Sequence, residues 1–204
     1  MTQRNIIIEP DTILRKKSDP LEKVDNELRK LMEWTGHGGI TNGMLNPSGM
    51  VSHYRRFDSL SEIDNHLSSA QSNPKVGEKI TQMNKMCERY ANMIFEVIRP
   101  VDGISDLSEY KFMVQWWFKV KPGHLGNVVD ILSDFQVEIG GVKPFIQMPL
   151  STPDLGDITM GTPIKSLSVI RSFSESRKAT SSMIDSLKEH IIGTKRMLSG
   201  HRTD

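Results

Sequence analysis

Cysteine is nearly absent from this sequence, which has Cys87 as its single example among 204 residues. One cysteine excludes an internal disulfide framework and any zinc site built from several thiolates. Paired imidazoles are missing as well, because no two of the six histidines are four residues apart, the helical spacing of many metal sites. We therefore predict no metal site and no cofactor. A chain with so little cysteine also fits a reducing, cytoplasmic location.

A strong net charge and long apolar runs are also absent. The formal net charge is +1 at pH 7, which gives no electrostatic footprint for nucleic acid. No apolar run approaches the roughly 18 residues that a membrane-spanning helix needs. The short run Ile6 to Ile8 is interrupted by Glu9, Pro10 and Asp11, so it lacks the pattern of a signal peptide. We expect neither a nucleic-acid partner nor a membrane partner.

The stretch from Tyr54 to Pro100 organises the first half of the chain. A strand over 50–57 precedes Ser59 and Glu62, which have the spacing of a helical capping box. Leucine and isoleucine then recur at helical spacing until Asn73-Pro74 ends that helix and begins another. The second helical stripe extends to Tyr90 and includes Cys87, and residues 93–99 alternate like a strand. The pattern predicts strand, helix, helix, strand, with 39–45 as a hairpin partner of 50–57.

The second half begins after a polar connector over 101–109. Residues 112–120 alternate cleanly, yet Met113 and Trp117 make the second face apolar too, which predicts a strand covered on both sides. A helix follows over 125–135, then a strand over 142–150 interrupted by Pro144, and a strand over 164–173. Ser174 can cap a last helix, and no clear fourth strand follows it. We expect Trp117 to be mostly buried between two sheets.

The halves are weakly similar to each other, which suggests internal duplication. Residues 54–59 correspond to residues 170–175, each at the end of a predicted third strand. The boundary then gives a first module over 1–101 and a second over 110–204. The order of elements predicts an α+β protein of two βαββαβ modules whose antiparallel sheets pack face to face.

Residues 39–200 resemble the ferredoxin-like dimeric α/β-barrel proteins of the antibiotic-monooxygenase and NIPSNAP-like type. Two segments carry the resemblance: Arg56-Phe57-Asp58-Ser59-Leu60-Ser61-Glu62, and the helix opening Lys121-Pro122-Gly123-His124. The resemblance implies two ferredoxin-like modules that form a pseudo-dimeric α/β barrel. It also implies a small-molecule ligand, because such proteins include cofactor-free monooxygenases.

Residues 6–32 resemble a different family, the N-terminal segment of peptide deformylases. Pro10-Asp11, Ile13-Leu14-Arg15 and a helix from Val24 to Met32 carry that resemblance. The later motifs of that family, a Glu-Gly-Cys-Leu-Ser run and a His-Glu-x-x-His helix, have no counterpart here. No catalytic residue can be carried over, so a deformylase-related hydrolase would be inactive. The segment is either part of the first module or a fusion to it.

Five residues are candidates for ligand binding, each with an ordinary structural alternative. Arg55 and Arg171, at matching repeat positions, could bind an anion or could be solvated strand-end charges. His53 could act as an acid or base, or could be structural. His124 could touch a ligand from its helix start, or could be a turn residue. Trp117 could stack on a planar ligand, or could pack in the core.

Three functions remain open. The chain could be a small-molecule-binding barrel protein without an identifiable catalytic residue, an inactive deformylase relative, or a structural module that forms homo-oligomers through its sheets. Whether it is an enzyme is left open by the sequence.

Overall fold

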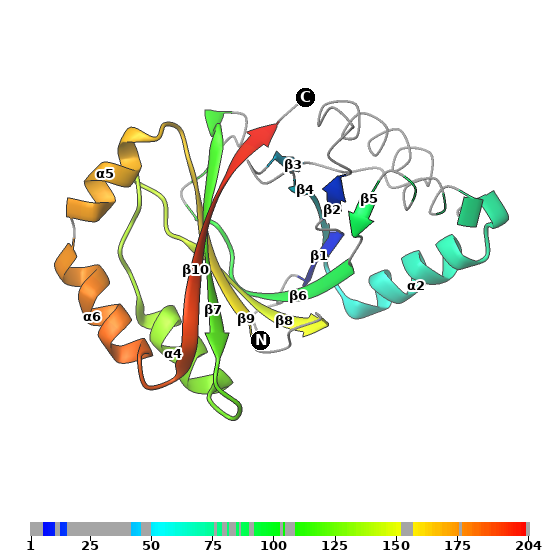
Figure 1. Ribbon diagram of the computed structural model, residues 1–204. Coiled ribbons are helices and arrows are strands. Elements are labelled where there is room, and N and C mark those ends of the chain that lie inside the picture. The colour runs from blue at the N-terminus through cyan, green and yellow to red at the C-terminus, as the bar shows by residue number, and fades with distance from the viewer. Residues whose placement is uncertain are drawn as a thin grey trace.

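The computed structural model describes residues 6–10, 13–15, 42–45, 50–75, 77–78, 81, 85, 87–89, 92–102, 104, 109–151, 157–175 and 177–202. Within these ranges the chain forms one ten-stranded antiparallel sheet with helices on its outer side (Figure 1). No helix in the described ranges is long and apolar enough to cross a membrane.

The first module contains four strands in the order β6-β1-β4-β3, which is the order of a ferredoxin-like fold. Its elements are β1 (Ile6–Pro10), β3 (Asn42–Leu45), β4 (Met50–Phe57), α2 (Leu60–Gln71) and β6 (Asn92–Arg99). Because β1 lies between β6 and β4, residues 6–10 are an inner strand of this module. The part of the deformylase-like segment that forms β1 therefore belongs to the barrel.

Two short strands, β2 (Ile13–Arg15) and β5 (Cys87–Arg89), are added to these four: β2 pairs with β4 on the same side as β1, and β5 pairs with β2. Cys87 was predicted on a helix, and that prediction is wrong. Its helical spacing to the preceding residues is overridden because Cys87 pairs with Arg15 of β2 across the sheet.

The second module repeats the arrangement in the order β8-β9-β7-β10. Its elements are β7 (Phe112–Val120), α4 (Leu125–Asp134), β8 (Phe145–Ser151), β9 (Asp157–Ile164), α5 (Ser168–Glu175), α6 (Arg177–Leu187) and β10 (Ile191–Arg202). The fourth strand that the sequence did not reveal is β10, which pairs along the whole length of β7.

The predicted strand over 164–173 is also wrong. The third strand of the second module is β9, which ends at Ile164, and α5 begins four residues later. Val169 and Ile170 of α5 pack against a cluster that contains Val114 and Ile164, so their apolar character serves helix packing. The matching of residues 54–59 with 170–175 fails for the same reason, because β4 corresponds to β9.

The two modules close into a barrel through pairs that join one module to the other. β6 pairs with β8 and β10 pairs with β3, while the β1–β4 pair completes a ring of eight strands. Helices α4, α5 and α6 lie outside the ring on one side and α2 on the other (Figure 1). The predicted α+β architecture of two ferredoxin-like modules in a pseudo-dimeric barrel is confirmed.

Strand β7 is covered on both faces, as predicted. On its outer face Phe118 and Val120 pack with Val128 and Leu132 of α4, and with Met183 and Leu187 of α6. On its inner face Gln115 is buried at 1% exposure. The outer cluster contributes most of the apolar burial that stabilises this half, and it leaves the inner face free to carry polar side chains.

Candidate site inside the barrel

Three polar side chains form a row across neighbouring strands on the inner face. Gln147 of β8 lies directly opposite Thr159 of β9, and Thr159 lies directly opposite Trp117 of β7. Residues next to them in sequence, including Ile146, Ile158 and Phe118, pack on the helices of the outer face. Because side chains alternate along a strand, the row must face the interior of the barrel.

Each member of this row has a buried polar atom that lacks a hydrogen-bond partner within the described part of the chain. These atoms are Trp117 Nε1, Gln147 Oε1 and Thr159 Oγ1. An indole N–H can only donate, an amide oxygen can only accept, and a hydroxyl can do both. A buried polar group left without a partner costs roughly 1–3 kcal/mol. Three such atoms in adjacent strands therefore mark a place where a bound molecule would supply the missing partners.

The rings of Phe95 and Trp117 lie together beside the row. Phe95 of β6 is fully buried and meets the Trp117 ring edge-on, with 6.0 Å between ring centroids and 75° between planes. Along the sheet β6 and β7 are three strand spacings apart, about 14 Å. The contact must therefore cross the inside of the curved sheet. Val97, opposite Gln147 and 5% exposed, continues the apolar side of the row.

A second row lies next to the first and is shaped by a glycine. Gly161 of β9 lies opposite both Phe145 of β8 and Gln115 of β7. A Cβ atom at Gly161 would be 2.5 Å from Phe145 Cζ and 3.1 Å from Gln115 Cγ. The Phe145 ring therefore lies over the backbone of β9, in space that any larger residue at position 161 would occupy.

Chemically, the first row can bind a molecule that is flat, uncharged and able both to accept and to donate hydrogen bonds. Phe95 and Trp117 offer aromatic surfaces, and the three polar atoms that lack partners among the described residues offer one donor, one acceptor and one hydroxyl. None of Gln147, Thr159 and Trp117 is ionisable near neutral pH. A charged group placed against them would lose its hydration without gaining a counter-charge from the row.

The predicted ligand-binding residues are not gathered at one place. Trp117 lies in the inner row, half-buried overall with its Nε1 fully buried. Arg171 is an exposed residue of α5 on the outer side, so its predicted equivalence with Arg55 at a strand end is wrong. His124 is the N-cap of α4. His53 and Arg55 lie in β4, opposite Gly43 and Ile8, and their side chains are outside the described part.

Gln147 and Thr159 were missed by the sequence analysis. Both are polar residues with apolar neighbours on either side in sequence, in Phe-Ile-Gln-Met-Pro-Leu and Ile-Thr-Met. Such an isolated polar residue in a buried strand is the signal that could have identified them. Their alignment with Trp117 depends on strand register, which no local pattern contains.

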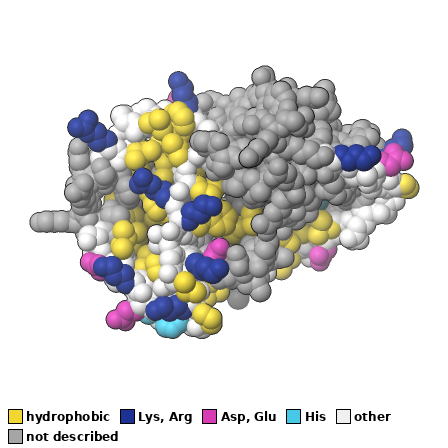
Figure 2. All heavy atoms as spheres, viewed as in Figure 1, with side chains coloured by type: hydrophobic (Ala, Val, Ile, Leu, Met, Phe, Trp, Pro, Cys, Tyr) yellow, Lys and Arg dark blue, Asp and Glu magenta, His cyan; other side chains and the backbone are white. Residues whose placement is uncertain are grey.

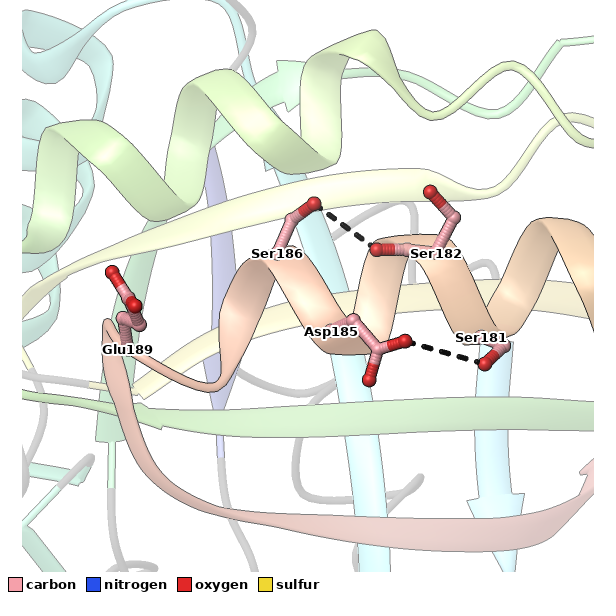
Figure 3. A pocket seen from close by; sticks show the side chains of 5 residues that line it. All are labelled: Ser181, Ser182, Asp185, Ser186 and Glu189. Atoms are coloured by element: carbon pink, nitrogen blue, oxygen red, sulfur yellow. Dashed lines mark hydrogen bonds between the residues drawn. The ribbon is translucent and has the colours of Figure 1, made fainter.

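A different depression lies on the outer surface, along one side of α6. Ser181, Ser182, Asp185, Ser186 and Glu189 line it (Figure 3). The hydroxyl of Ser186 donates to the Ser182 carbonyl at 3.0 Å, and Lys188 lies 2.6 Å from Asp185. This hydrogen bond from Lys188 holds the pKa of the Asp185 carboxyl below its usual value. All five lining residues are exposed, so the depression is a solvated helix face.

On the side shown in Figure 2, the charged side chains of the described residues are scattered. Lysine and arginine side chains there are spread among hydrophobic and neutral ones, and over the described residues they form no continuous basic surface. No group of three or more histidine, cysteine or acidic side chains in the described ranges could hold a metal ion.

No protein-family model matches the chain, and no curated protein matches it, peptide deformylases included. Solved structures do match over nearly the full length. An anthrone oxidase-like protein matches with a TM-score of 0.70 at 10% identity, covering 98% of this chain and 93% of that one. A candidate monooxygenase of Fusobacterium nucleatum matches with a TM-score of 0.67 at 13% identity, covering 98% and 94%.

A third solved structure that matches is described as a ferredoxin-fold protein. A ferredoxin-fold protein of Listeria monocytogenes, related to antibiotic biosynthesis monooxygenases, matches with a TM-score of 0.54 at 8% identity, covering 100% and 97%. At such identities the likeness carries the fold alone. The chain is therefore similar, over nearly its whole length, to the ferredoxin-fold proteins related to antibiotic biosynthesis monooxygenases.

Proposed function

We propose that this protein binds a small, planar, uncharged organic molecule inside the barrel, against Gln147, Thr159 and Trp117. The observation that carries the proposal is the row of three buried polar atoms without partners in the described part of the chain. Native proteins pair most of their buried polar groups, so unpaired ones in adjacent strands call for a functional explanation.

The chemistry of the row favours an aromatic ligand that carries both a carbonyl and a hydroxyl or amine. A carbonyl would accept from the Trp117 N–H, and a hydroxyl or amine would donate to Gln147 Oε1. The Phe95 and Trp117 rings would pack against the ligand's flat faces or edges. The similarity to an anthrone oxidase-like structure supports the same class, since an anthrone is a planar aromatic ketone.

Oxidation of the bound molecule is a second candidate function. It is favoured by the fold shared with the anthrone oxidase-like and monooxygenase structures. Oxygen uptake in the presence of a bound ligand would test it, and uptake that the Trp117→Phe variant does not alter would count against it.

Binding of 1,8-dihydroxyanthraquinone, measured by calorimetry, tests the first proposal. Trp117→Phe keeps an aromatic ring but removes the indole donor, so we expect affinity to fall by roughly five- to tenfold. Gln147→Leu, which removes the acceptor, should weaken binding by a similar factor. Trp116→Phe is the matched control, because Trp116 is the adjacent tryptophan and packs on the helix side.

The proposal fails if Trp117→Phe and Gln147→Leu bind 1,8-dihydroxyanthraquinone as the parent does, because the interior row then contributes nothing. It also fails if no planar hydroxy-ketone binds the parent protein. Circular dichroism of each variant shows whether a lost affinity reflects a lost fold.

A further inference from the structure

Two histidines that are far apart in the sequence meet at one end of the second module. His124 and His190 are 66 residues apart, yet their Nδ1 atoms lie 2.9 Å from each other. His124 is the N-cap of α4, at the end of the Lys121-Pro122-Gly123 turn, and Gly123 has a φ of 81°. His190 is in the turn between α6 and β10. The sequence argument against paired imidazoles covered only neighbours along one helix, so it could not detect this pair.

Backbone hydrogen bonds hold the two turns together independently of the imidazoles. The Lys121 N–H donates to the His190 carbonyl at 2.9 Å, and the His190 N–H donates to the Leu187 carbonyl at 2.8 Å. The Lys121 ammonium donates to the Glu189 carbonyl at 2.8 Å. The two rings are therefore brought together by a framework that would persist if either ring were replaced. Such preorganisation lowers the entropy cost of binding a ligand between them.

The positions of the rings suit a shared metal ion. In a tetrahedral zinc site with Zn–N bonds near 2.0–2.1 Å, two ligand nitrogens lie about 3.4 Å apart. The observed nitrogen separation of 2.9 Å is shorter by a few tenths of an ångström. The ring centroids are 5.1 Å apart and the planes are tilted by 44°. A small rotation of each ring, with little movement of its centre, would turn both lone pairs toward one ion.

We propose that His124 and His190 form a two-imidazole site for Zn²⁺, bound through Nδ1 of each ring. The ion would replace the proton that the two Nδ1 atoms share in the hydrogen bond. No third histidine, cysteine or acidic side chain completes the set among the described residues, so water would fill the remaining positions. Such a site is open and exchangeable, unlike a closed structural zinc site of four protein ligands.

Binding would clamp the start of α4 to the start of β10, because the two ligands belong to the turns that precede these elements. An ion that binds the folded state and not the unfolded chain raises the melting temperature. This inference does not depend on the ligand row inside the barrel, since neither histidine belongs to that row.

Titration of Zn²⁺ into metal-free protein tests the site. We expect the parent to bind zinc at the pair and to gain thermal stability, while His124→Gln and His190→Gln each lose that binding and that gain. His66→Gln is the matched control, because His66 is also half-buried and packs on an aromatic ring, Phe57, at 5.5 Å between centroids. This control should bind zinc as the parent does.

A spectroscopic measurement separates ligation from general stability. Zinc on both Nδ1 atoms leaves the proton on Nε2 of each ring, which long-range ¹H–¹⁵N spectra of the histidines detect. Zinc that leaves these two rings unchanged, or that binds the two variants as it binds the parent, would overturn the proposal. Absence of zinc binding by the parent would also overturn it, and the pair would then be a hydrogen bond only.

Discussion

Gly161 is the residue whose lack of a side chain shapes the interior of the barrel. The Phe145 ring occupies the space above it, and Gln115 fills the other side at 1% exposure. Aromatic and amide side chains thus pack across β9 at the one position where no Cβ intervenes. Glycine in a strand commonly marks such a close approach.

Gly161→Ala should therefore lower the free energy of unfolding. The added methyl would overlap the Phe145 ring at 2.5 Å, and overpacking of this kind costs about 1–3 kcal/mol. Urea unfolding measures the loss. Phe145→Leu removes the ring, so in the Gly161→Ala/Phe145→Leu double variant the alanine should cost distinctly less than it does alone. Equal costs of the alanine in both backgrounds would show that the ring is not the obstacle.

For single residues, the sequence predicted which face of a strand a side chain occupies better than it predicted which residues lie beside it. Trp117 was identified from its position on the second face of β7, and the structure places it on the inner face. Its side chain is largely but not completely buried and its Nε1 is fully enclosed, in agreement with the expected burial. Gln147 and Thr159 were missed because their partnership depends on the register of three strands, a property of the whole sheet.

Helix α2 shows how a short local signal can fix an element. The Glu62 N–H donates to Ser59 Oγ at 3.2 Å, and the Asp58 N–H donates to Glu62 Oε2 at 2.9 Å. This pattern satisfies N–H groups that the first turn leaves without intrahelical partners. Ile63, 2% exposed, then packs on Phe57 at the end of β4. The cap and one buried contact together set where the helix begins.

Ser59→Ala should destabilise this helix by about 1 kcal/mol, the typical cost of losing an N-cap hydroxyl. Thermal unfolding followed by circular dichroism measures the change. Ser61→Ala is the control, because Ser61 is exposed in the first turn of the same helix and alanine is the better helix former. If both variants melt at the same temperature, the Ser59 hydroxyl does not act as a cap.

The elements that the sequence missed lack such local signals. β10 contains Gly193, Gly200 and three basic residues, and its residues 192–196 are exposed, so no apolar alternation marks it. It is a strand because β7 supplies its hydrogen bonds. β9 was obscured by Gly161 and Pro163, and the apolar residues that follow it belong to a helix. Tertiary pairing therefore decided the elements for which propensity was weak.

At the scale of the whole molecule, closure of the barrel depends on two seams between the modules. One seam is the β3–β10 pair and the other is the β6–β8 pair. The eight strands of the ring have partners on both sides, so the barrel does not require a second chain to complete its sheet. The predicted homo-oligomer would then have to form through another surface, and it stays a prediction.

Arg99 reinforces the β6–β8 seam. It is the last residue of β6 in the first module, and its guanidinium donates to three carbonyls of the second. Nε donates to Pro144 at 2.8 Å, and Nη1 donates to Ser133 at 3.2 Å and to Phe135 at 2.8 Å. Ser133 and Phe135 are at the end of α4, where carbonyls have no intrahelical donors and the helix dipole favours a cation.

Burial lowers the pKa of the Arg99 guanidinium from its ordinary value, yet an arginine stays protonated at any pH where the protein is folded. Its three hydrogen bonds offset part of that loss of hydration, while Nη2 is buried without a partner in the described part of the chain. Arg99→Met keeps much of the apolar stem and removes all the donors. We therefore expect the free energy of unfolding to fall by about 3 kcal/mol, because half-buried carbonyls lose charged partners.

Urea unfolding of Arg99→Met, followed by both tryptophan fluorescence and circular dichroism, tests this role. Loss of the Arg99 hydrogen bonds at this seam should lower the urea concentration at the unfolding midpoint. If the two modules then unfold one after the other, the fluorescence and circular dichroism transitions should no longer coincide. Arg99→Lys should fall between parent and Arg99→Met, since an ammonium cannot reach three carbonyls with the geometry of a guanidinium. Arg196→Met is the control, because Arg196 is an exposed arginine of β10. A midpoint of Arg99→Met equal to that of this control would mean that strand pairing alone holds the modules together.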